Sequence, residues 1–218
     1  MSNIRKLLLD VCLLAALCSL ATAQTGKIES IGPATNASIS DAVKKTLDSK
    51  GYRAILDDGS VACEIWLRSN LPGPAKKDVE GAIYPFAESS LIGVISFPQA
   101  TTDYRGQAIK PGTYTLRYEL IPSDGNHLGV SQNRDFLLLL PAGSDPDPDA
   151  VFKFQDLVEL SRHATGTRHP GPLSLAQAKS STPSLAKDEE EHWVFYAGVK
   201  LGGEDVPIAL VVKGTAPQ

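Results

Sequence analysis

The residues best suited to bind a ligand lie in one polar stretch, Ser123-Asp124-Gly125-Asn126-His127. It lies between two apolar segments, and Arg134 and Asp135 stand at the start of the second one. A carboxylate, an amide and an imidazole in one loop can bind a polar ligand, and loops at the end of a sheet commonly carry such sites. We therefore expect Asp124, Asn126, His127 and Arg134 to take part in ligand binding. The plainer alternative is that Arg134 and the Asp124 loop hold each other as a structural clasp.

Three histidines could extend this site. His127 belongs to the polar stretch, whereas His163 and His169 occur later, in the segment RHATGTRHPG. A zinc site needs three or four ligands that converge in space, and these residues show no ligand spacing. If the two loops meet at one end of the sheet, His163 and His169 join the ligand-binding set. Whether any metal binds there is left open.

Standard enzyme signatures are missing from the chain. It contains no GxSxG, HExxH, P-loop or GxGxxG after a strand, and no pair of CxxC motifs. We therefore name no catalytic residues and expect no cofactor.

Only Cys63 remains once the first 23 residues are set aside, because the other two cysteines lie within them. It occurs in the alternation Val61, Cys63, Ile65, Leu67, which is typical of a half-buried strand. We predict a buried, unreactive thiol and no disulfide bond within the chain.

The polar loop needs a β-rich framework to position it. Residues 113–121 alternate apolar and polar side chains, and residues 136–140 are apolar throughout, which predicts a strand covered on both faces. Other apolar runs and turn signals predict further strands at 52–56, 61–68, 81–86, 91–97, 193–201 and 206–213. Short helices are expected from Ser38 to about residue 50 and from Phe154 to just before Gly166.

The resulting fold class is mainly β: an antiparallel β-sandwich or jelly roll with two short helices at connections. No internal repeat or linker divides the chain, so we expect residues 24–218 to form a single β-sandwich domain. Residues 143–149 predict a stiff acidic connector with alternating prolines. The stretch near 176–191 has no apolar period and is expected to be a flexible loop.

Residues 1–23 have the pattern of a signal peptide. Two basic residues precede an apolar run, and Ala21-Thr22-Ala23 offers a cleavage site. Removal of this leader would change the net charge from −4 to −5, since it carries two basic residues and one acidic residue. We therefore expect a periplasmic or secreted protein with no transmembrane segment after cleavage, and its scattered basic residues predict no nucleic-acid partner.

Three sequence blocks resemble a known group of proteins. PGTYTLRY, DGNHLGVSQNRDFLLLLPA and LSRHATGTRHPGPLSL, in this order, look like a family of uncharacterised secreted bacterial proteins with a predicted β-sandwich core. The resemblance covers Gly93 to Leu175 and implies a sandwich fold and export, with no known activity. It also implies that the DGNH loop and the RHATGTRHPG loop belong to one unit.

These observations predict an exported, non-enzymatic β-sandwich domain that binds an unknown ligand or envelope partner through its end loops. The alternative is a metal-dependent or hydrolytic enzyme that uses His127, His163 and His169.

Overall fold

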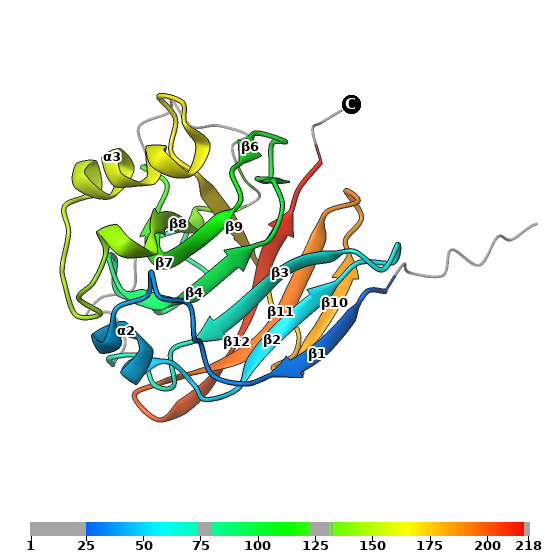
Figure 1. The fold of residues 1–218 in the computed structure, drawn as a ribbon, viewed down its shortest axis with the longest axis horizontal. Coiled ribbons are helices and arrows are strands. Elements are labelled where there is room, and N and C mark those ends of the chain that lie inside the picture. The colour runs from blue at the N-terminus through cyan, green and yellow to red at the C-terminus, as the bar shows by residue number, and fades with distance from the viewer. Residues whose placement is uncertain (1–24, 74–79, 123–130, 132, 216–218) are drawn as a thin grey trace, which may run out of the picture.

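The structure is a computed structural model, and it describes residues 25–73, 80–122, 131 and 133–215. The described chain is mainly antiparallel β with short helices at its connections, which confirms the expected fold class. Ten strands form one large sheet in the order β1-β2-β3-β4-β7-β8-β9-β12-β11-β10, and β5 and β6 form a separate two-stranded sheet (Figure 1).

The strands vary from two to ten residues in length. Their bounds are β1 Lys27–Ile31, β2 Gly51–Ile55, β3 Val61–Leu67, β4 Leu91–Phe97, β5 Thr101–Thr102, β6 Ala108–Ile109, β7 Gly112–Leu120, β8 Asp135–Pro141, β9 Pro172–Ala176, β10 Ser184–Lys187, β11 Trp193–Leu201 and β12 Glu204–Lys213.

The large sheet curls until its two end strands meet. Thr25, just before β1, forms an antiparallel bridge with Ala186 in β10, and the Gly26 amide donates to the Leu185 carbonyl at 3.0 Å. A nearly closed sheet leaves few unpaired strand edges, which protects it from pairing with other chains. It also gives the sheet an enclosed face and an outer face.

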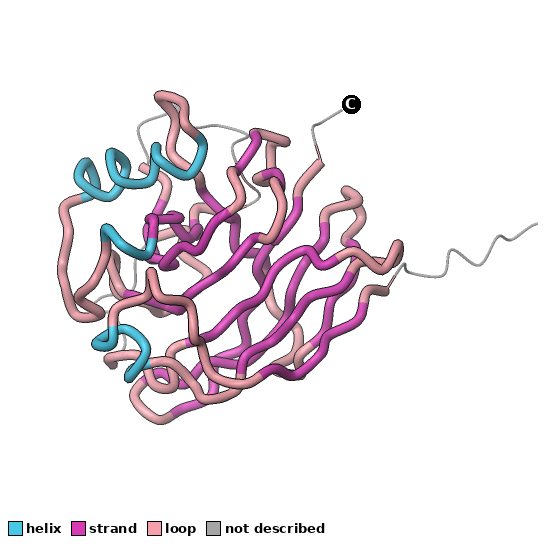
Figure 2. Tube along the Cα trace, in the orientation of Figure 1, coloured by secondary structure: helices cyan, strands magenta, loops and turns pink. Residues whose placement is uncertain are grey.

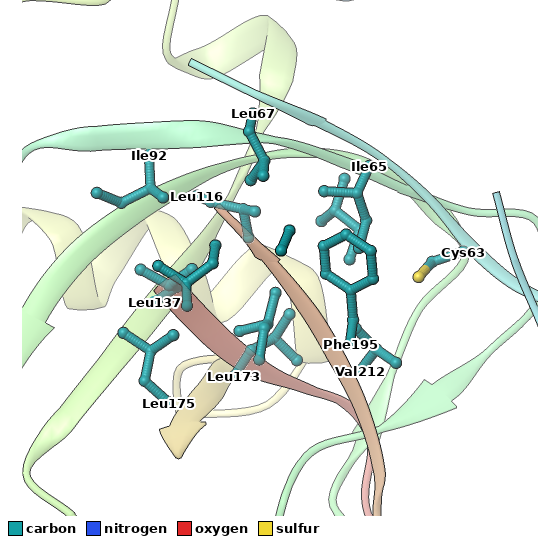
Figure 3. Packing of buried hydrophobic residues seen from close by; sticks show 14 of the residues in the cluster. Cys63, Ile65, Leu67, Ile92, Leu116, Leu137, Leu173, Leu175, Phe195 and Val212 are labelled. Atoms are coloured by element: carbon teal, nitrogen blue, oxygen red, sulfur yellow. The ribbon is translucent and has the colours of Figure 1, made fainter. Parts of the chain in front are cut away.

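The enclosed face holds the main hydrophobic core. Nine of the ten strands of the large sheet contribute buried side chains to this core. Phe195 lies among the core side chains drawn in Figure 3. The alternation in β7 explains the pattern: Tyr114, Leu116 and Tyr118 face inward, whereas Arg117 lies on the other face. Burial of apolar area on this scale is the main stabilising term for the fold.

Two α-helices cover parts of the outer face, α2 at Asp41–Thr46 and α3 at Phe154–Thr165, and a 3₁₀ turn, η1, spans Ala142–Ser144 (Figure 2). The α2 residue Val43 packs with Trp66 and Leu91, and α3 covers β8. Because Leu137 and Leu139 face the interior while Leu138 and Leu140 pack outward against α3, the prediction that β8 is covered on both faces is confirmed. Neither α-helix in the described ranges has the length and apolar character needed to cross a bilayer.

Several sequence-based expectations about elements were wrong. The first helix is capped by the Ser40 hydroxyl, which accepts a hydrogen bond from the Val43 amide, so it begins later than Ser38. Residues 81–86 form no strand; their apolar side chains Tyr84 and Phe86 pack into the core from a loop. Residues 184–187 were expected to be part of a flexible loop. They form β10, because the edge of β11 is available for them to pair with.

Candidate functional site

An apolar cavity of about 180 Å³ lies between α3 and the outer face of the sheet. Its floor is formed by Phe136 and Leu138 of β8 together with Pro172 and Ser174 of β9. These side chains share one side because Phe136 is paired with Ser174, and Leu138 with Pro172, across the two strands.

The roof of the cavity comes from α3. Phe154 and Val158 lie one helical turn apart and line the cavity, and Leu157, which is fully buried, fixes the helix on the sheet. The helix ends at Gly166, which adopts the left-handed conformation with φ of 71°, and it carries no proline or glycine before that point. The expected end of the helix just before Gly166 is confirmed.

The loop after α3 closes one end of the cavity with Pro170. Thr165 Oγ1 donates to the His169 carbonyl at 2.7 Å, and the His169 amide donates to Thr167 Oγ1 at 3.0 Å. Gln107 then reaches across and donates through Nε2 to the Pro170 carbonyl at 2.9 Å. These bonds hold the loop in one shape beside the cavity.

The rim of the cavity is formed by the residues that flank the polar loop at 123–130. Ile121 and Pro122 line the cavity before this loop, and Ser131 lines it afterwards. Ser131 Oγ is buried and has no hydrogen-bond partner in the structure. None of the described residues that line the cavity is charged, so its chemistry is apolar with hydroxyl groups at two serines.

Arg134 holds this rim in place. Its Nε donates to the Ile121 carbonyl at 2.9 Å, and its Nη1 donates to the Glu80 carbonyl. Arg134 is half-buried, and its side chain packs over Gly81, which has a positive φ of 77°. Arg134 therefore links two backbone carbonyls of the described chain. The predicted clasp between Arg134 and the Asp124 loop stays a prediction, because that loop lies outside the described residues.

Asp135 points to the opposite side of the strand and is fully buried. Its carboxylate accepts from the Tyr118 hydroxyl at 2.6 Å and from the amides of Ile83 and Tyr84 at 2.9 and 3.0 Å. Burial, and then the neighbouring carboxylate, raises the pKa of the Tyr118 hydroxyl far above its usual range. Asp135 thus anchors the 83–84 loop to the core.

The histidine site predicted from sequence is only partly described. His163 lies in the last turn of α3 and His169 lies in the following loop, and both residues are exposed. Neither lines the cavity, although His169 directly precedes Pro170. Asp124, Asn126 and His127 lie outside the described residues, so the three-histidine arrangement stays a prediction. Within the described ranges no group of three or more His, Cys, Asp or Glu residues is placed to hold a metal ion.

One acidic side chain is buried on the outer face next to the cavity floor. Glu119 of β7 is paired across the strands with Phe136 and is 3% exposed. Burial, and then the charge of Glu88, raise the pKa of the Glu119 carboxyl to about 7. Glu119 is therefore the buried acid of this face whose charge changes near neutral pH.

The residues that build the cavity were missed by sequence reasoning. The apolar run of β8 predicted a covering layer, and the residues from Phe154 to just before Gly166 predicted a helix. Both patterns are equally compatible with a fully packed contact, and no sequence pattern marks the hollow between Leu138 and Val158. The polar loop at 123–130 lies outside the described residues, so its part in ligand binding stays a prediction; the described residues that flank it line the cavity.

Comparisons of the chain with protein-family models, curated proteins and solved structures found no match. The fold defines the chain as a mainly antiparallel β protein with a nearly closed sheet. The resemblance to secreted bacterial proteins stays a prediction.

Proposed function

We propose that this chain is an exported, non-enzymatic domain that binds a small ligand at the α3 end of its sheet. The observation that carries the proposal is the cavity beneath α3, whose described lining residues carry no charge and whose rim is formed by the residues on either side of the 123–130 loop. Ligand sites are commonly apolar hollows with a few polar groups, positioned by rigid elements and bordered by loops. The leader at residues 1–23 supports export, to the periplasm or beyond the cell.

The size of the cavity limits what it can hold. Drug-sized ligands need about 300 to 1,000 Å³, whereas an engineered apolar cavity of about 150 Å³ holds benzene. At about 180 Å³, the α3 cavity matches a compact apolar group. We therefore place a small molecule, or the apolar end of a larger one, in this site.

The proposal is tested by thermal unfolding of the purified protein with and without benzene, which should raise the melting temperature through preferential binding to the folded state. Val158→Trp fills the cavity from the roof and should remove the shift. Gln155→Trp introduces the same side chain at an exposed position of α3, and this variant should retain the shift in melting temperature. If benzene gives no shift in the unaltered protein, or the same shift in Val158→Trp, the cavity is not a binding site.

A further inference from the structure

The acidic connector at residues 143–149 contains the only two aspartate–proline bonds of the chain, Asp145-Pro146 and Asp147-Pro148. An aspartic acid before proline can cleave its own peptide bond, because its carboxyl group reaches its main-chain carbonyl carbon through a five-membered ring. The proline nitrogen assists, since it accepts a proton more readily than an ordinary amide nitrogen. Both bonds share this chemistry, so a difference between them must come from the fold.

The Asp145 side chain is held away from this reaction. Asp145 is fully buried, and its carboxylate accepts from Arg117 Nε and Nη2 at 2.8 and 2.7 Å. Thr115 Oγ1 donates to the same carboxylate at 2.6 Å. Rotation of the carboxylate towards its own carbonyl carbon would break these bonds and leave a buried guanidinium without its partner, which is costly.

The Asp147 side chain is exposed, and its main-chain carbonyl is polarised. In the described chain its carboxylate makes one hydrogen bond, in which Oδ1 accepts from the Asp149 amide at 3.0 Å. The Asp147 carbonyl oxygen accepts from Arg117 Nη2 at 2.6 Å. A guanidinium at this oxygen stabilises the negative charge that develops there when the carbonyl carbon is attacked.

The other charged groups around this bond are already paired. Arg117 pairs with Asp145, and Arg68 Nη2 pairs with the Asp149 carboxylate at 2.6 Å. In the described chain, Asp147 is therefore the acid of the connector that belongs to no ion pair.

We propose that Asp147-Pro148 is a self-cleavage site. The protonated Asp147 carboxyl adds one oxygen to the Asp147 carbonyl carbon, its proton passes to the Pro148 nitrogen, and the bond between this carbon and nitrogen breaks. The cyclic anhydride that forms is opened by water to two carboxyl groups, so the net reaction is hydrolysis. Because the attacking carboxyl must carry a proton, cleavage accelerates as the pH falls.

The two fragments should stay together after the cut. β8 lies before the cleaved bond and β9 after it, and the two strands pair in the large sheet. The new Asp147 carboxylate is formed beside Arg117, which favours its retention. The product is therefore a nicked, folded protein whose fragments separate on denaturation.

The unaltered protein provides the first test. It is incubated at the lowest pH at which its circular dichroism spectrum remains that of the folded protein, and in parallel at pH 7. Mass spectrometry of the denatured products should detect fragments that end at Asp147 and begin at Pro148, with less cleavage at pH 7. These fragments should exceed those from Asp145-Pro146 by about tenfold or more. In denaturant at the same acidic pH, the two bonds should break at similar rates.

Variants identify the groups that act. Asp147→Ala should abolish cleavage at this bond, whereas Asp149→Ala makes the same change at the next acid and should retain it. The double variant Arg117→Met with Asp145→Leu removes the donor to the Asp147 carbonyl without leaving a buried charge. It should slow the cleavage at Asp147-Pro148 by about tenfold or more.

Three results would overturn the proposal: no cleavage at Asp147-Pro148, equal cleavage of both bonds in the folded protein, or an unchanged rate in a folded double variant. The comparison of the two bonds uses the unaltered protein, so it decides the question even if the double variant fails to fold.

Discussion

The Arg117 guanidinium and the Asp145 carboxylate form a two-pronged ion pair with both residues fully buried. Nε and Nη2 of Arg117 donate to the two carboxylate oxygens at 2.8 and 2.7 Å. Thr115 Oγ1 donates to the same carboxylate at 2.6 Å. Other guanidinium N–H groups donate to three backbone carbonyls: Asp147 in the acidic connector, Ala150 directly after it, and Ser89 in the loop before β4. The pair therefore joins the outer face of β7 to the chain that leads into α3.

Removal of one partner of this pair should be costly. Arg117→Met leaves the Asp145 carboxylate buried and unpaired, and we expect it to lower the free energy of unfolding by about 3 to 5 kcal/mol. The double variant Arg117→Met with Asp145→Leu should recover most of that loss, because no buried charge is left. Denaturant titration measures both changes.

A surface pair provides the control. Arg53 and Glu64 are also joined by hydrogen bonds, but their side chains are 39% and 28% exposed. Arg53→Met should therefore cost no more than about 1 kcal/mol. Equal effects for Arg117→Met and Arg53→Met would contradict the assignment of the buried pair as a structural anchor.

Arg134→Ala tests the clasp at the cavity rim. The substitution removes donors to the Ile121 and Glu80 carbonyls, and we expect a loss of about 1 to 3 kcal/mol in the free energy of unfolding. Arg168→Ala, at an exposed position, serves as the matched control and should change stability by less than about 0.5 kcal/mol. A similarly small change for Arg134→Ala would show that its bonds add nothing to stability.

Local patterns predicted the elements whose environment is encoded in neighbouring residues. The alternation of β7 and the unbroken apolar run of β8 each reflect which faces are buried, so both strands followed from the sequence. The structure adds that the two strands pair antiparallel. The end of α3 was equally predictable, because Gly166 supplies the left-handed residue that terminates it.

Features that depend on distant partners could not be predicted. β10 has a polar sequence and becomes a strand because β11 offers a free edge. Arg117 reads as an exposed strand residue, yet Asp145, far along the chain, allows it to be buried. The cavity walls belong to this group, because they arise from the docking of α3 on β8 and β9.

Cys63 should be unreactive in the folded protein. It is fully buried in the core, and burial raises the pKa of its thiol well above the usual range, so the reactive thiolate is suppressed. We expect slow modification by a thiol reagent under native conditions and rapid modification in denaturant. The contribution of Cys63 is isolated by comparison with Cys63→Ala. Rapid native modification that disappears in Cys63→Ala would show that this part of the core opens readily.

Glu119 should make stability depend on pH. Since the pKa of its carboxyl is about 7 in the folded chain, above the ordinary value of 4.5, the folded chain retains a proton that the unfolded chain has lost at intermediate pH. Stability from this group is therefore fully present below about pH 4.5 and declines as the pH rises towards 7. The shift corresponds to about 3 kcal/mol, at 1.36 kcal/mol for each pH unit.

Glu119→Gln isolates this contribution, because the amide has nearly the same shape and carries no charge at any of these pH values. We expect the variant and the original protein to have similar stability near pH 4.5, and the variant to be more stable by about 1 to 3 kcal/mol at pH 8. Glu88→Gln, which removes the exposed neighbouring charge, should give a smaller gain in the same direction, since burial is the larger cause of the raised pKa. Denaturant titrations at the two pH values measure these differences. A Glu119→Gln variant that is less stable at pH 8 would mean that the ionised carboxylate is stabilised by its surroundings, and that the buried acid beside Phe136 is a paired charge.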